Sequence, residues 1–164
     1  MARKFLSTLR NALLAEIEND ADLDMTASVD LLVAVHQRLA KLAAQIRSHA
    51  GNAPYSQIAA ELHRIATEKQ SDADELKKRV INYGGRTRAP TTSSASGKNH
   101  WERMVLDLGD QKSLEDFLQQ QQARFAAAEP EIIQILTGLE ARQVSHRKAL
   151  AKLVAIADPQ ATQT

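Results

Sequence analysis

Four prolines divide this chain into segments that can each form one long helix. Proline lacks the backbone N–H that a helix interior needs, and glycine is favoured just after a helix, so both residues mark helix ends. Between these marks apolar residues recur every three or four positions, and no segment alternates apolar and polar residues as a strand does. The chain is therefore predicted to be all-α. The breaks lie at Pro54, Pro90, Pro130 and Pro159, with Gly51, Gly84, Gly85 and Gly97 beside them.

The segments between the breaks are long enough for a helical bundle preceded by a shorter helix. An amphipathic helix and an acidic link form a first unit, the bundle forms a second, and a short tail that we expect to be disordered ends the chain. We expect these units at residues 1–24, 25–158 and 159–164, with helices at about 3–17, 26–50, 55–83, 100–128 and 130–157.

The lengths of the connections predict how the bundle helices pack. The first and second are joined by a short turn, as are the third and fourth, and short links make antiparallel neighbours. Residues 85–99 form the one long connection, which is rich in small and polar residues. A single long connection lets the chain cross the length of the bundle. We therefore predict an antiparallel four-helix bundle with a crossover between helices two and three.

Composition narrows the kinds of chemistry available. The chain has no cysteine, which excludes disulfides, thiolate metal sites and cysteine nucleophiles. Its net charge is +1, so bulk charge does not indicate a polyanion binder. The longest aliphatic run, residues 31–35, is far too short to span a membrane, and the N-terminal residues lack the continuous apolar stretch of a signal peptide. We expect a cytoplasmic protein without a membrane span.

Polar residues interrupt the apolar stripes near the middle of three helices. In the last helix Gln143 and His146 stand at core positions between Leu139 and Leu150. An unpaired buried polar group costs about 1–3 kcal/mol, so a cluster at one level indicates mutual hydrogen bonding, a ligand or an ion. The stripe of the second helix also passes Lys69. The predicted polar layer consists of Glu68, Ser71, Asp72, Gln121, Gln143 and His146.

The polar parts of the second and fourth bundle helices resemble the metal-binding motifs of the ferritin-like superfamily, of which rubrerythrins are an example. Members of that superfamily that bind metal through carboxylates place one Glu on each of two helices and a Glu-x-x-His motif on each of the other two. In the stretch 58–71 Glu68 falls on the motif's Glu and Ser71 on its His, whereas Gln143 and His146 fall on the second motif with Gln in place of Glu. The resemblance implies a ferritin-like bundle with Glu68 and His146 as its two remaining metal ligands.

The other two helices depart from the family's pattern as well. The third helix has Gln121 where a Glu is expected, and the first has no carboxylate near His36. Two iron ions need several carboxylates to offset and bridge their charges, and a neutral amide supplies no charge. We therefore expect no di-iron centre, no ferroxidase activity and no cofactor, with a single iron or zinc ion as the alternative.

Three functions remain open on these grounds. The degenerate motifs favour a non-enzymatic ferritin-like binding or assembly module that forms a homo-oligomer, with an unknown ligand. A second possibility is an iron-handling oxidase or iron-storage protein with an atypical site. The third is nucleic-acid binding through a basic helix end and connector. The basic residues there are Lys77, Lys78, Arg79, Arg86, Arg88, Lys98 and Arg103. We expect the remaining histidines, His36, His49, His63 and His100, on the surface.

Overall fold

The computed structural model describes residues 2–90, 97–126 and 129–158, with side chains from residue 25 onward. Four helices make up the fold, and the described residues contain no strand. The helices are α1 (Ala2–Gly51), α2 (Ser56–Asn82), α3 (His100–Phe125) and α4 (Pro130–Ile156). Among the described residues no helix is both long and apolar enough to cross a membrane.

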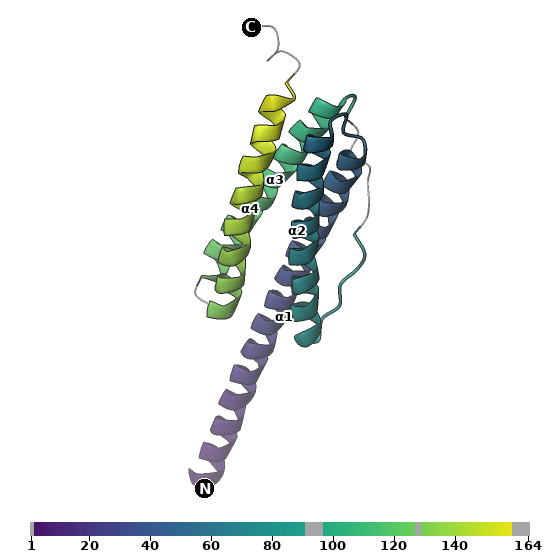
Figure 1. Cartoon of the computed structure of the whole chain (residues 1–164). Coiled ribbons are helices and arrows are strands. Elements are labelled where there is room, and N and C mark those ends of the chain that lie inside the picture. The colour runs from purple at the N-terminus through teal and green to yellow at the C-terminus, as the bar shows by residue number, and fades with distance from the viewer. Residues whose placement is uncertain (1, 91–96, 127–128, 159–164) are drawn as a thin grey trace.

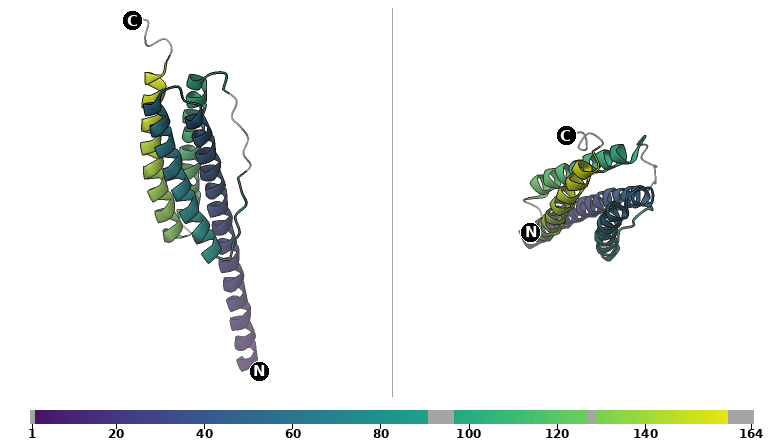
Figure 2. Two further views of the ribbon diagram at one scale, coloured as in Figure 1. Left: turned by 45° about the vertical axis from the view of Figure 1, so that its right-hand side comes forward. Right: turned by 45° about the horizontal axis from the view of Figure 1, so that its top comes forward.

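The helices form two antiparallel hairpins that pack against each other (Figure 1). The hairpin of α1 and α2 contacts that of α3 and α4 mainly through α1 and α3, while α2 meets α4 more lightly. The end of α2 and the start of α3 lie at opposite ends of the bundle, so the connection between them spans its length (Figures 1 and 2). This is the predicted ferritin-like order with a crossover between the second and third helices, which the structure confirms.

Local sequence accounts for the start of α3, the start of α4 and the end of α2. The Asn99 side chain accepts a hydrogen bond from the backbone N–H of Glu102 at 2.8 Å, which caps the start of α3. Pro130 occupies the first turn of α4, where its missing N–H would have no helical partner. Past α2, Gly84 adopts a φ of 79°, a conformation that favours glycine.

Helix α1 is longer than the bundle. The structure places residues 2–51 in one continuous helix, so the segment expected as a separate short helix and acidic link is part of α1. Residues 18–24 contain neither proline nor glycine, and their acidic side chains alone do not stop a helix. As a result, the N-terminal part of α1 projects beyond the other three helices (Figures 1 and 2).

The core is built from the apolar stripes that the sequence predicts, mostly aliphatic side chains. On α1 the apolar stripe is buried throughout, with exposures of 5% or less for Leu32, Val35, Leu39, Leu42 and Ile46. The other three helices face these residues with stripes of the same period. Apolar side chains therefore fill most of the core, and buried polar residues interrupt them at the middle of the bundle and between α1 and α3.

Candidate functional site

A lysine lies at the centre of the polar layer. Lys69 of α2 is fully buried, and its Nζ donates hydrogen bonds to the side-chain oxygens of Gln111 on α3 and Gln143 on α4. Its position follows from the helical period, because residues 65, 69, 72 and 76 all fall on the inward face of α2. One ammonium thus joins three of the four helices at the middle of the bundle.

The two glutamine amides extend this network with their N–H groups. Gln111 Nε2 donates to the backbone oxygen of Gln143 at 2.9 Å and to Glu115 at 3.1 Å. Gln143 Nε2 donates to Asp72 at 3.2 Å. Each amide therefore accepts from Lys69 on one side and donates to a carboxylate on the other.

Arginines of α4 close the network toward solvent. Arg142 Nε lies 2.8 Å from Asp72 Oδ1, and Arg147 Nε lies 2.9 Å from Glu115 Oε2. Burial raises the pKa of the Asp72 carboxyl, while the charge and hydrogen bond of Arg142 oppose that rise. A cleft of about 340 Å³ between α2 and α4 reaches the Asp72–Arg142 pair. The carboxylates around the layer are thus already paired with cations of the chain itself.

The protonation of Lys69 is finely balanced. Burial lowers the pKa of its ammonium from 10.5 to about 7, against the attraction of Asp72, Glu115 and Asp107. Both hydrogen-bond acceptors are neutral amide oxygens, and a neutral amine still has two N–H groups to donate. The network can therefore keep both bonds when Lys69 loses its proton.

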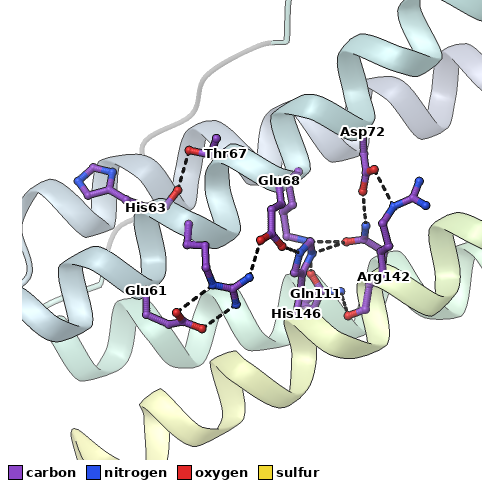
Figure 3. Close-up of polar contacts among 11 residues, drawn as sticks. Glu61, His63, Thr67, Glu68, Asp72, Gln111, Arg142 and His146 are labelled. Atoms are coloured by element: carbon purple, nitrogen blue, oxygen red, sulfur yellow. Dashed lines mark hydrogen bonds and ion pairs between the residues drawn. The ribbon is translucent and has the colours of Figure 1, made fainter.

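Glu68 and His146 form a pair at the edge of the layer. His146 Nε2 lies 2.8 Å from Glu68 Oε2, and Figure 3 shows the two side chains turned toward each other. Burial lowers the pKa of His146, and the hydrogen bond from His146 lowers that of Glu68, followed by the effect of Arg64. A neutral imidazole beside a carboxylate carries its proton on Nε2 and donates it to Glu68. The Glu68 side chain itself is 47% exposed, so this pair links the buried layer to solvent.

The structure brings together some residues of the predicted layer and not others. Asp72, Gln143 and His146 are buried within the network. Ser71 is exposed, because it lies two positions from Lys69 and so about 200° away around the helix. Gln121 does not take part either, since it lies about 15 Å further along α3 than Gln111 at 1.5 Å per residue. Ser71 and Gln121 are therefore corrected to positions outside the layer.

Sequence reasoning placed Lys69 on the α2 stripe but left it out of the predicted layer, and it missed Gln111 and Glu115. The signal for Gln111 was present, because the inward stripe of α3 starts well before Leu114. Its buried residues include positions 104, 107, 111, 114 and 118, with an unbroken three-four spacing. The signal for Lys69 was its place on the α2 stripe, which a positive charge made easy to dismiss.

A second polar cluster lies between α1 and α3. His49 Nδ1 is 2.8 Å from Asp107 Oδ2, and Gln45 Nε2 donates to Asp107 at 2.9 Å and to Asp110 at 2.8 Å. Asp107 is fully buried and His49 is 4% exposed. The expectation of a surface position is therefore wrong for His49.

The expectation of a surface position is also wrong for His36, which is 5% exposed and contacts the backbone oxygen of Ala73 at 2.9 Å. It follows Val35 on α1 and lies three positions before Leu39, at the edge of the buried stripe. His63 is exposed as expected, and His100 is partly buried. No carboxylate stands at the His36 position.

Residues of the predicted basic stretch differ in what they contact. Arg79 pairs with Glu75 at 3.4 Å and with Glu131 at 3.6 Å. Arg103 donates from Nε to the backbone oxygen of Gly97 at 3.3 Å. Lys77 and Lys78 are exposed. Nucleic-acid binding through this stretch stays an untested prediction.

The hydrogen bonding of Gln143 leads to a prediction of its own. Gln143→Leu removes an acceptor from Lys69 and a donor from Asp72, so we expect a loss of about 2–3 kcal/mol in the free energy of unfolding. Chemical denaturation of the full-length protein measures this change. Gln134→Leu, at an exposed position of the same helix, is the matched control. Equal stability of Gln143→Leu and the unmodified protein would show that the amide contributes nothing.

The fold is that of the ferritin-like four-helix bundle. Solved structures with this arrangement include bacterioferritin from Rhodobacter capsulatus, with a TM-score of 0.75 and 15% identity over 84% of this chain and 89% of that one. A dodecameric thioferritin from Bacteroides fragilis, a bacterioferritin-related protein, has a TM-score of 0.72 and 13% identity over 85% and 90% of the chains. BfrA from M. tuberculosis has a TM-score of 0.73 and 15% identity over 84% and 88%.

Sequence comparison alone does not detect this relationship. No family model matches the chain, and no curated protein matches it. At 13–15% identity the similarity establishes the fold and leaves the site to be argued from the residues of this chain. The suspected resemblance to the ferritin-like superfamily is thus confirmed at the level of the fold.

The comparison with solved structures corrects a further expectation. We expected no cofactor, or a single iron or zinc ion as the alternative. The R. capsulatus bacterioferritin, which shares this fold over most of its length, is described with a metal-free dinuclear site and haem iron. The fold is therefore one that carries a dinuclear site and haem in another protein.

The residues at the centre of this bundle do not fit a dinuclear carboxylate site. Lys69 places a positive group between the helices, and the amides of Gln111 and Gln143 bring no charge. In the part of the chain that the structure describes, no three His, Cys, Asp or Glu side chains are grouped so that they could hold a metal ion. The carboxylates present are instead paired with Arg142 and Arg147.

Proposed function

We propose that this chain is an iron-handling ferritin-like subunit for which iron is cargo. The observation that carries the proposal is the bacterioferritin-like fold, which extends over 84% of this chain and 89% of the R. capsulatus protein. The agreement includes the long crossover, which an ordinary up-down-up-down bundle does not need. Because that fold serves iron-containing proteins, iron is the ligand that it favours here.

The centre of the bundle supports a structural role for the polar layer within such a subunit. Arg142 and Arg147 already pair with carboxylates that would otherwise attract cations. The layer joins α2, α3 and α4 through hydrogen bonds, so it sets their relative positions. We propose that oxidation of iron at the bundle centre is not the task of this subunit.

We also propose that Glu68 and His146 are the side chains that a ferrous ion contacts in passing. Glu68 is partly exposed, His146 lies directly behind it, and both carry atoms that bind transition metals. Two ligands bind a metal ion weakly, which suits cargo in transit. The pair keeps the role expected from the ferritin-like motif, without the full set of ligands.

Assembly into a homo-oligomer is part of this proposal. The thioferritin with the same fold is dodecameric. In this chain α1 continues beyond the bundle, and its first residues carry an apolar stripe at helical spacing in the sequence. An isolated amphipathic helix gains stability in water by burying that stripe, and a second copy of the chain offers the matching surface.

Iron uptake by the purified full-length protein tests the proposal. Ferrous iron is added in air, with more iron than the two ions per chain that one dinuclear site would hold. The sample is then separated by size-exclusion chromatography, and each fraction is measured by light scattering and by an iron assay. We expect iron to elute with an oligomeric protein peak, without a fast oxidation phase that saturates at one dinuclear pair per chain. Glu68→Gln should slow uptake several-fold.

The matched control is Glu61→Gln, because Glu61 pairs with the same Arg64 at 2.7 Å and does not contact His146. If the iron stays in the small-molecule fraction, iron handling is excluded. A saturating fast phase would instead show oxidation at a resident centre. Equal slowing by both variants would remove the specific role of Glu68.

A further inference from the structure

A second groove lies beside the hydrogen bond between Gln45 and Asp110. It has a volume of about 680 Å³ and lies between α1 and α3, with residues 88–90 of the connector along one side. That volume falls in the range of small-molecule sites in proteins, roughly 300–1,000 Å³. The crossover of this fold therefore helps to form a cavity large enough for a nucleotide.

Three cationic side chains converge on this groove. Arg38 and Lys41 come from one turn of α1, and Arg88 comes from the connector. None of the three forms an ion pair with a carboxylate within the described residues, in contrast to Arg64, Arg79, Arg142 and Arg147. The groove has one acidic residue, Asp110, which already accepts a hydrogen bond from Gln45. The groove therefore has an excess of positive charge.

Arg38 is held in place by an aromatic ring. Its guanidinium carbon lies 4.1 Å from the centre of the Phe117 ring, a distance at which the ring attracts a cation. A guanidinium held over a ring by its charge still has five N–H groups, which can bind oxygens. Such an arginine loses less freedom on binding an anion than a mobile one, which favours affinity.

The floor of the groove is apolar. Leu42 and Leu114 are buried beneath it, and Pro90 contributes a further apolar surface from the connector. A site with cations at its rim and an apolar floor suits a ligand with both a charged group and an apolar body. Three separate cations match several negative charges better than the single charge of one carboxylate.

From this arrangement we propose that the groove binds a phosphorylated organic molecule of nucleotide size. The phosphates contact Arg38, Lys41 and Arg88, and the apolar body lies over Leu42 and Leu114. The proposal does not depend on the iron-handling function, because none of these residues takes part in the polar layer or the Glu68–His146 pair. It places a second ligand class on the chain.

Calorimetric titration of the full-length protein tests the proposal, with ADP as the probe and adenosine and inorganic pyrophosphate for comparison. We expect saturable binding of ADP that weakens at higher salt, with adenosine and pyrophosphate each at least about tenfold weaker. Lys41→Gln and Arg88→Gln should each weaken ADP binding about tenfold, since each removes one charge-assisted contact. Asp110→Asn should tighten it several-fold, because it removes the groove's negative charge.

Arg47→Gln is the matched control, because Arg47 is exposed on α1 and does not line the groove. Circular dichroism of each variant separates loss of binding from loss of folding. Absence of saturable ADP binding at low salt would overturn the proposal, as would an equal loss in Arg47→Gln. Binding of a single-stranded oligonucleotide in place of ADP would overturn it in favour of a nucleic-acid surface. Pyrophosphate binding as tight as that of ADP would show that the apolar body of the ligand contributes nothing, which would also overturn the proposal.

Discussion

Lys69→Met is expected to abolish a rise in stability of about 5 kcal/mol that we expect for the unmodified protein between about pH 7 and pH 10.5. Burial lowers the pKa of Lys69 from 10.5 to about 7, so in this range the unfolded chain binds a proton that the folded chain has released. Stability increases with pH wherever the unfolded state binds more protons, by about 1.4 kcal/mol for each pH unit and group. Below pH 7 the full cost of burying the charge is present, and above pH 10.5 it is gone.

The same substitution should change absolute stability in a pH-dependent way. Methionine donates no hydrogen bonds, so the side-chain oxygens of Gln111 and Gln143 lose their donor, at about 2–4 kcal/mol in total. At high pH this loss appears in full. Near pH 6 the difference should change sign, leaving Lys69→Met about 1–3 kcal/mol more stable than the unmodified protein, because methionine also removes the larger cost of burying an ammonium.

Urea denaturation at several pH values between 6 and 10 measures both effects. Lys78→Met, at an exposed position of the same helix, is the control and should keep the pH dependence of the unmodified protein. An identical pH profile for Lys69→Met and the unmodified protein would show that Lys69 keeps an ordinary pKa. That outcome would place its ammonium in contact with water and contradict the lysine-centred layer.

The second large effect is expected at the cluster between α1 and α3. Asp107→Ala should lower the free energy of unfolding by about 3–5 kcal/mol, because Asp107 is fully buried and is the shared partner of Gln45 and His49. Its removal takes from the buried His49 imidazole the carboxylate that it faces, and takes from Gln45 one of its two acceptors. Thermal and chemical unfolding measure the loss.

Asp110→Ala is the matched control for Asp107→Ala. It also accepts from Gln45, at 2.8 Å, but its side chain is exposed and water can replace it. We expect it to cost less than about 1 kcal/mol. Equal effects of the two substitutions would mean that burial does not decide the contribution of Asp107.

The sequence alone was enough to predict the helices and their order. Prolines and glycines set most of the helix ends, and the apolar period identified the buried faces, as on α1 from Leu32 to Ile46. Both signals are local, since they depend on residues within a few turns of one another. The 85–99 connection is long enough to cross the length of the bundle, and this length indicated the ferritin-like order of the two helix pairs. The exception is α1, where acidic residues were taken for a break that the backbone does not make.

Only the tertiary structure decided which polar residues meet. The level at which helices align depends on their relative shift along the bundle axis, and a shift of one helical turn, about 5.4 Å, leaves the periodicity of every stripe unchanged. This is why Gln111 takes the place expected for Gln121, and why His49 finds Asp107 in the interior. The burial of Lys69 is likewise a tertiary outcome, since an ammonium can be buried only where partners from other helices converge on it. The sequence therefore determined that the middle of this bundle is polar, while packing determined that a lysine is its centre.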